Sequence, residues 1–281
     1  MSGKFQNINF DIDKLPMMPL VATQMMELIN TPETSASALA KVVEKDPAVS
    51  ARVLKIANSS FYSMSRQVTS LSTAVVILGE RTLKNLVLAA SMRGMNQSFG
   101  KVEQMLWEDS MVCALGARYL ASKLGLVDPE EAFMAGLFRH IGLVVINNQQ
   151  GDAAEFIIKS MESKNLIMAE QERSIFGATH AEIGAAVLEN WKLSELLSLV
   201  ALHHSDIAFA DQVDTNVVNM VCIVNIAGQL PGYFGIYGKE HDLNLEQLPS
   251  VLKLNVATDR VSEIIEEFFD IFKENRSDFL S

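Results

Sequence analysis

Hydrophobic residues recur at spacings of three and four positions along nearly the whole chain. This spacing gathers apolar side chains on one face of a helix, and no sustained alternation with a period of two indicates strands. The pattern therefore predicts an all-α fold, a multi-helix bundle. The predicted helices cover about 18–29, 36–45, 47–58, 70–78, 80–97, 102–124, 129–149, 152–164, 168–175, 180–191, 194–205, 214–229 and, in a C-terminal stretch, 246–277.

Polar residues and prolines mark where several of these helices begin. Two Asp-Pro pairs, at 46–47 and 128–129, offer a capping side chain followed by proline at the first helical position. Thr179 and Glu182 have the spacing of a capping box. The proline and glycines of residues 231–238 predict a loop, because they interrupt any helix.

Composition and charge narrow the partners and the compartment. The formal net charge is −11, with 34 acidic against 23 basic residues, so most of the surface would repel phosphate backbones and we expect no nucleic-acid partner. No apolar run approaches the roughly 18 residues that span a bilayer, so we expect no membrane segment. Cys113 and Cys222 suit reduced core thiols, and the N-terminus lacks a secretory signal, which predicts a cytoplasmic protein.

Histidine is the main candidate for chemistry, because the nucleotide-binding glycine loops and the serine-hydrolase elbow are absent. His140, His180, His203 and His204 fall on predicted helices that could converge. A hydrolytic metal site needs several neutral imidazoles and carboxylates around one or two ions. The spacing of the histidines supports a metal site only weakly. His203 and His204 are adjacent, so they lie about 100° apart on a helix and cannot both face one ion unless the helix ends there.

Each histidine also has a structural explanation. His140 lies among apolar helical neighbours and could be a buried side chain satisfied by one hydrogen bond. His180 could support the start of its helix, beside the capping box. His203 and His204 could cap a helix C-terminus as protonated imidazoles. His241, in a polar segment, could simply be solvated.

Several motifs, in order along about residues 13–210, resemble those of the HDOD family. They are Leu15-Pro16-Met17-Met18-Pro19, the segment from Asp46-Pro47 to Asn58-Ser59, the segment from Ser70 to Gly79, Ala135-Gly136-Leu137-Phe138-Arg139-His140-Ile141-Gly142, His180-Ala181-Glu182-Ile183-Gly184, Trp191 and His203-His204. The resemblance implies a helical core similar to that of HD-type phosphohydrolases. It also implies a place among bacterial regulatory output modules.

The resemblance suggests a division of the chain. Residues 1–12 would be an N-terminal tail, and 13–210 the HDOD domain, with an N-terminal bundle at about 13–98 and an HD-like core at about 101–210. Residues 211–281 would form a C-terminal helical extension of the same fold. The polar residues near 96–101 are the expected break between bundle and core.

The departures from the catalytic pattern concern its metal ligands. In the catalytic HD-type relatives a His-Asp doublet lies just before Ile-Gly, and these positions are here Arg139 and His140; an upstream histidine of that pattern falls on Asp109, and a late aspartate on Asn225. A guanidinium has no acceptor and repels a cation. The resemblance thus implies that Asp109, His140, His180 and His203 or His204 could hold one divalent metal ion, or that Arg139 could bind an anion.

We therefore predict a non-catalytic regulatory module that contacts other signalling proteins. A metal-dependent phosphohydrolase with a rearranged ligand set is the first alternative, because four histidines lie on neighbouring predicted helices. A sensor of an anionic small ligand, clamped by Arg139, is the second.

Overall fold

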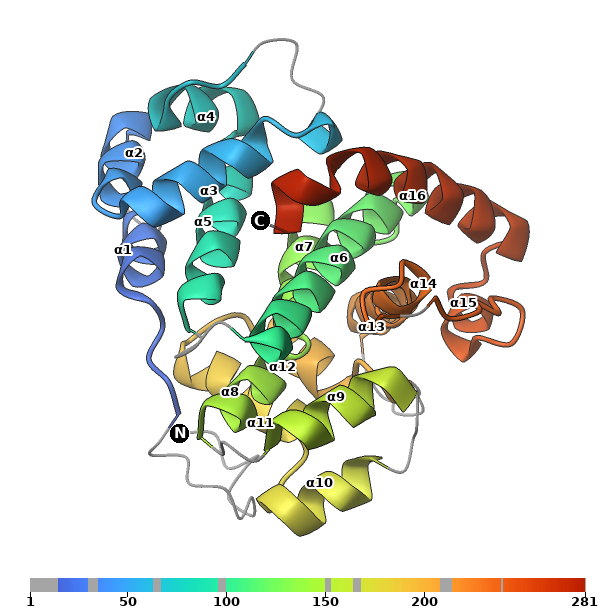
Figure 1. Cartoon of the computed structure of the whole chain (residues 1–281). Helices are drawn as coiled ribbons and strands as arrows, with labels where there is room; N and C mark the ends of the chain where they lie inside the picture. Colours follow the sequence, from blue (N-terminus) through green and yellow to red (C-terminus); the bar gives the residue numbers. More distant parts are fainter. Residues whose placement is uncertain are drawn as a thin grey trace. The chain divides into compact units, whose positions relative to one another are not determined.

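The computed structural model of the protein describes residues 15–29, 35–62, 67–95, 100–149, 153–163, 168–207, 214–238 and 240–280. These residues form helices, turns and loops, and no strand occurs among them, which confirms the all-α prediction (Figure 1). None of the helices in these ranges is long and apolar enough to cross a membrane. The predicted tail at 1–12 and residues 96–99 of the predicted break lie outside the described part.

The chain forms two compact units. One comprises Met18–Gln97 and Glu267–Ser281, and the other comprises Met1–Met17 and Ser98–Glu266. The division of the chain at 13–98, 101–210 and 211–281 stays a prediction. The C-terminal helix contributes residues to both units.

The smaller unit is built from short helices around an aliphatic core. Leu39, Val43, Ile56, Leu83 and Leu86 are fully buried there. Phe61 meets Phe268 and Phe279 of the C-terminal helix edge to face, with ring centroids 6.3 and 5.8 Å apart. Its elements are α1 (Leu20–Ile29), α2 (Ala36–Glu44), α3 (Pro47–Ala57), η3 (Ser60–Tyr62), α4 (Leu71–Leu78), α5 (Glu80–Met92), η4 (Arg93–Met95) and the end of α16 (Thr258–Leu280).

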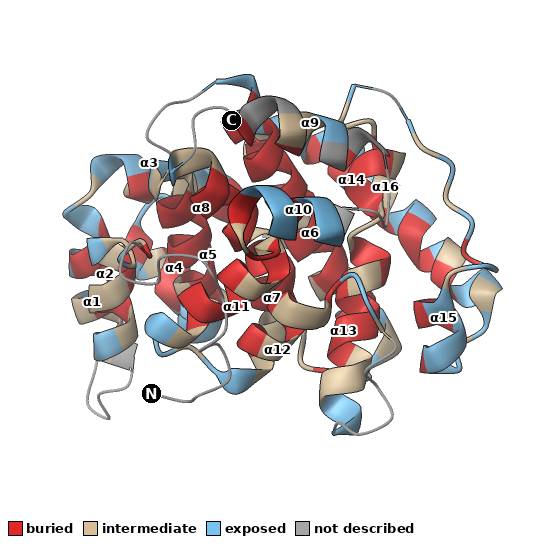
Figure 2. Cartoon of the chain, turned by 90° about the horizontal axis from the view of Figure 1, so that it is seen from below, coloured by how far each residue is buried: buried red, intermediate tan, exposed pale blue. Residues whose placement is uncertain are grey.

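The larger unit surrounds one long, almost wholly buried helix, α6 (Lys101–Leu124). Helices α7 and α13 pack on α6, while α11 packs between α8 and α12. Figure 2 shows these helices coloured mainly as buried. The other elements are α7 (Pro129–Phe138), α8 (Ile141–Gln149), α9 (Ala153–Ser163), α10 (Met168–Phe176), α11 (His180–Asn190), α12 (Glu195–His203), α13 (Thr215–Ala227), α14 (Leu230–Tyr233), α15 (Pro249–Leu254) and the first part of α16, up to Glu266.

The helix starts read from the sequence are confirmed. Asp46 accepts the backbone N–H groups of residues 48 and 49, and Asp128 those of residues 130 and 131, each before a proline. Thr179 and Glu182 form a reciprocal capping box at the start of α11. These local hydrogen bonds satisfy backbone donors that the first helical turn leaves without partners.

Some predicted segments differ from the structure. The C-terminal stretch predicted at 246–277 is divided into α15 and α16, because Asn255 adopts a left-handed backbone conformation that ends α15. The predicted loop at 231–238 begins within a short helix, α14, whose proline occupies an early position that needs no N–H donor. The predicted helix at 129–149 is interrupted at Arg139 and His140, so that α7 ends at Phe138 and α8 begins at Ile141. No proline or glycine at residues 139–140 announces this break. It lies at the candidate site.

Gly142 explains how α8 and α11 approach one another. A methyl group on Gly142 would lie 1.9 Å from the carbonyl oxygen of His180 and 2.9 Å from the backbone nitrogen of Gly184. Only glycine allows two backbones to meet this closely. The contact holds the start of α11, and with it His180, beside the break at His140.

Candidate metal centre

A buried ion pair lies where the interrupted helix meets α6. Arg139 donates from its two terminal nitrogens to the two oxygens of Asp109, both at 2.8 Å. The side chains are 2% and 0% exposed. Burial alone would raise the pKa of Asp109, but the charge of Arg139, followed by the contact with His140, outweighs it and lowers that pKa. Asp109 is therefore ionised and held by a bidentate, charge-assisted contact.

Two further side chains complete the shell of Asp109. The hydroxyl of Tyr237 donates to Oδ1, and Nδ1 of His140 lies 2.9 Å from Oδ2. Burial and the carboxylate of Asp109 raise the pKa of Tyr237 well above its usual value, so the phenol keeps its proton. Asp109 thus has four donor contacts within the described chain and no accessible surface.

His140 links this ion pair to two other histidines. The ring of His140 packs against the rings of His180 and His204, with centroid–centroid distances of 5.3 and 5.1 Å. Burial, and then the charge of Arg139, lowers the pKa of His140 to about 4. The imidazole is therefore neutral at physiological pH, the state in which histidine binds metals.

His180 is the first residue of α11 and is held by Glu172 of α10. Nδ1 of His180 lies 2.7 and 2.9 Å from the two carboxylate oxygens, and the backbone N–H of His180 donates to Oε2 at 2.9 Å. Burial would raise the pKa of Glu172, but these hydrogen bonds lower it. An ionised carboxylate only accepts, so Nδ1 carries a proton, and in the neutral imidazole Nε2 of His180 then has the lone pair.

His204 follows the last residue of α12 and has the same tautomer. Its Nδ1 lies 2.8 Å from the carbonyl oxygen of Ala201, which can only accept, so Nε2 is again the acceptor. Burial, followed by the repulsion that His140 and His180 would exert in their protonated forms, lowers the pKa of His204 well below its usual value. His204 does cap the C-terminus of α12, as one reading of the sequence predicts, but burial favours its neutral form over the protonated one.

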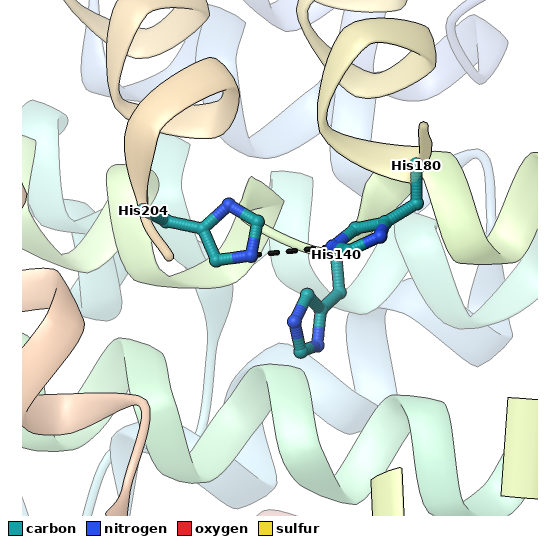
Figure 3. Close-up of side chains that lie close together, drawn as sticks. All are labelled: His140, His180 and His204. Atoms are coloured by element: carbon teal, nitrogen blue, oxygen red, sulfur yellow. Dashed lines mark hydrogen bonds between the residues drawn. The ribbon is translucent and has the colours of Figure 1, made fainter. Parts of the chain in front are cut away.

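The two acceptor nitrogens of His180 and His204 face each other. Their Nε2 atoms are 3.3 Å apart (Figure 3). Two lone pairs at this distance need a cation or a proton between them. Nitrogens bound at about 2.0–2.1 Å to a tetrahedral Zn²⁺ lie about 3.3–3.4 Å apart. Together with His140, the three residues offer one ligand nitrogen each within 4.8 Å of one another. The donor set fits one transition-metal ion.

The predicted candidates divide accordingly. The structure brings His140, His180 and His204 together, while His203 lies outside the group, since its side chain leaves the helix in another direction. Asp109 contacts His140 as an acceptor and is not one of the three grouped residues. Arg139 was expected to bind an external anion; the anion that its terminal nitrogens contact is Asp109 itself.

Other functional contacts escaped the sequence-based prediction. Glu172 and Tyr237 carry no motif, and only packing brings them to His180 and Asp109. The solvation predicted for His241 is also incomplete, since its ring lies 5.8 Å from that of Tyr237 and close against Gly232. The sequence does not distinguish Glu172 from the other polar residues of α10, because only the structure shows which face of this helix is exposed.

Asn225 positions the end of α12. Its Nδ2 donates to the carbonyl oxygen of His204 at 2.8 Å, and its Oδ1 accepts from the hydroxyl of Ser250, which is fully buried, at 2.9 Å. The amide supplies a donor that an aspartate lacks. Asparagine at this position thus suits a hydrogen bond to the backbone beside His204.

Asn225→Asp should lower the free energy of unfolding by about 1–3 kcal/mol, because a carboxylate would face the His204 carbonyl where an N–H now donates. Chemical denaturation monitored by circular dichroism measures this loss. Ser250→Ala removes the second hydrogen bond only and should cost about 1 kcal/mol. Equal effects of the two substitutions would contradict the role given to the amide.

The sequence profile of the HDOD domain matches residues 15–207 of the chain. A curated relative, an uncharacterized protein of Treponema pallidum, is 25% identical over 198 residues; the match covers 69% of this chain and 38% of that protein. The chain therefore spans well under half the length of this relative. Asn225, Tyr237 and Ser250 lie beyond the matched residues.

Solved structures share the fold. An HDOD domain protein of unknown function from Geobacter sulfurreducens aligns with a TM-score of 0.75 at 24% identity, covering 96% of this chain and 93% of that one. A Shewanella amazonensis protein, provisionally described as a phosphohydrolase, aligns at 0.72 and 24%, covering 96% of both chains. A Marinobacter aquaeolei protein, provisionally described as acting in signal transduction, aligns at 0.68 and 22%, covering 97% of this chain and 61% of that one. At these identities the likeness concerns the fold.

Proposed function

Because the chain belongs to the HDOD domain family, we propose that it is a cytoplasmic regulatory module that acts through contacts with signalling proteins. On this proposal it does not hydrolyse phosphate esters by the metal-dependent route of the HD enzymes. The observation that carries the proposal is the buried pair of Arg139 and Asp109.

Because Asp109 is paired with Arg139, its carboxylate is not available as a metal ligand. Asp109 is fully buried, and its oxygens already meet Arg139, His140 and Tyr237. A divalent ion at this place would meet the positive charge of the guanidinium within a few ångströms, where like charges repel strongly in a low-dielectric interior. A metal site that depends on Asp109 is therefore disfavoured.

The three histidines support a single-ion centre next to this pair, with Nδ1 of His140 lying 2.7 Å from a terminal nitrogen of Arg139. Imidazole ligands favour Zn²⁺, Fe²⁺, Ni²⁺ or Cu²⁺ over Mg²⁺ and Ca²⁺, which prefer oxygen ligands. An ion bound by three imidazoles could acidify a water in its fourth position. The two carboxylates that contact these histidines, Asp109 and Glu172, are both engaged as acceptors and are poorly placed to act as a base. We therefore assign the centre a structural or sensory role.

Helix α4 carries a candidate surface for contacts with a partner protein. Val76 and Ile77 are adjacent apolar side chains that are 77% and 44% exposed. Paired exposed apolar residues of this kind suit a contact with another protein. The two buried free cysteines, Cys113 and Cys222, agree with a reducing compartment.

Metal analysis combined with a phosphatase assay tests the proposal. Tag-free protein loaded with Zn²⁺ and dialysed should retain about one ion per chain by elemental analysis. His204→Gln should lose this ion, and His203→Gln, altered at the adjacent residue outside the group, should keep it. Neither zinc- nor manganese-loaded protein should release phosphate from p-nitrophenyl phosphate or cleave cyclic dinucleotides above the rate without protein.

The same experiment tests the second candidate function, a phosphohydrolase with a rearranged ligand set. The facing Nε2 atoms of His180 and His204 favour it, because they could hold a catalytic ion. Saturable turnover that disappears in His180→Gln and persists in His203→Gln would establish this function and overturn the regulatory proposal.

A further inference from the structure

We propose that α10 transmits the occupancy of the three-histidine centre to the protein surface, with Glu172 as the connecting residue. An ion bound at the centre would hold α10 more firmly, and loss of the ion would loosen it. The inference rests on the metal centre proposed above and adds to it a route of regulation.

Helix α10 is a surface helix with few buried side chains. Between Ala169 and Phe176, only Glu172 and Phe176 are buried, while the intervening and preceding residues are exposed. Figure 2 draws α10 largely in the colour of exposed residues. Few buried apolar contacts make a helix open locally at low free-energy cost. The stability of α10 must therefore depend strongly on its two buried side chains.

Glu172 is an unusual anchor, because it is a fully buried charge. Its side chain is 1% exposed, and both carboxylate oxygens are directed at His180, at the ring Nδ1 and the backbone N–H. A buried carboxylate is costly unless it is paired and hydrogen-bonded. The attachment of α10 thus depends on how well His180 donates to Glu172.

Two other contacts attach α10 to the described part of the chain. Arg173 makes two hydrogen bonds of 2.8 Å with Glu182, but its side chain is 56% exposed, and exposed ion pairs contribute little. Phe176 meets Phe156 edge to face at 5.4 Å. Neither contact involves the histidine group. Among the described side chains of α10, from Ala169 to Phe176, Glu172 is therefore the buried one that connects the helix to the centre.

Binding of a cation at Nε2 of His180 would strengthen this connection. A metal withdraws electron density from the ring, so the Nδ1–H becomes a better donor to the carboxylate, and the carboxylate in turn makes the imidazole a better ligand. Coupling of this kind is reciprocal: the factor by which the ion stabilises attached α10 equals the factor by which attached α10 increases ion affinity. Removing such a partner typically lowers metal affinity by about 10–100-fold.

The exposed face of α10 carries an apolar side chain that a partner protein could contact. Ile175 is a large apolar side chain that is 55% exposed. Any partner that contacts Ile175 would bind attached and detached α10 differently. Occupancy of the histidine centre could in this way change a protein contact without any chemical reaction.

Hydrogen exchange measured by mass spectrometry on the full chain tests the proposal, with Zn²⁺ added or removed by a chelator. Zinc should slow exchange of the α10 amides by about 10-fold or more in the wild-type protein, by the reciprocity of the coupling. Glu172→Gln, a neutral variant of the same size, should bind zinc about 10–100-fold more weakly by calorimetry. At saturating zinc its α10 amides should no longer respond.

Glu170→Gln is the matched control, because it removes a carboxylate from the exposed face of the same helix. It should keep both the zinc affinity and the exchange response of the wild type. Zinc that binds the wild-type protein without slowing α10 exchange would overturn the coupling and leave the metal centre standing. Absence of zinc binding would overturn the centre and the coupling together. The wild-type comparison suffices if Glu172→Gln fails to fold.

Discussion

Arg139→Met should lower the free energy of unfolding by about 3–5 kcal/mol. Methionine approximates the length of the arginine stem but leaves Asp109 buried without its charged partner. Breaking a buried pair from one side is strongly destabilising, because the remaining charge has neither water nor a counter-ion. Equilibrium denaturation in urea at neutral pH measures the loss.

The double variant Arg139→Met with Asp109→Asn is the control. It removes both charges, so it should recover more than half of the stability lost in the single variant. In this double variant the hydroxyl of Tyr237 can still donate a hydrogen bond to the amide oxygen of the asparagine that replaces Asp109. A loss below about 1 kcal/mol in Arg139→Met would show that the pair is not the desolvated contact that the geometry indicates.

The same pair predicts a pH dependence. Burial would raise the pKa of Asp109, but Arg139 and His140 outweigh this and lower it. The pair therefore contributes stability above the ordinary carboxyl pKa of about 4, and this contribution is lost as the pH falls through the lower folded-state value. The stability difference between wild type and Arg139→Met should shrink at acid pH. A difference that grows on acidification would contradict the sign.

Gly142→Ala should lower the free energy of unfolding by about 3 kcal/mol or more and abolish ion binding at the histidine centre. The new methyl group would lie 1.9 Å from the carbonyl oxygen of His180, and the atoms that it meets are backbone atoms. A side chain could rotate away, whereas here α8 and α11 must separate. Separation moves His180 away from His140 and His204. Denaturation and zinc calorimetry measure the two effects.

Gly94→Ala is the matched control for this substitution. A methyl group on Gly94 has nothing within 4 Å, and the residue does not need a left-handed backbone. Its stability should stay within about 0.5 kcal/mol of the wild type. If Gly142→Ala had the same stability and the same zinc affinity as the wild type, the close approach of α8 and α11 would be refuted.

Much of the fold could be predicted from local patterns. Helix α6 (Lys101–Leu124) agrees with the predicted helix at 102–124, and α13 (Thr215–Ala227) with that at 214–229, because amphipathic spacing depends on neighbouring residues only. The caps at Asp46 and Asp128 are equally local. The break between α7 and α8 carries no such signal. It coincides instead with contacts between distant residues, Arg139 with Asp109 and Gly142 with His180.

The sequence by itself determined an all-helical chain, its helix starts, a set of candidate histidines and a guanidinium where the catalytic relatives have a ligand. The tertiary structure decided which histidines meet: His204 joins His140 and His180, and His203 does not. It also supplied Glu172 and Tyr237 as partners and showed that Arg139 pairs with Asp109. Helical periodicity is a property of a few neighbouring residues, whereas these contacts join residues that only the packing of α6, α10, α11 and α12 brings together.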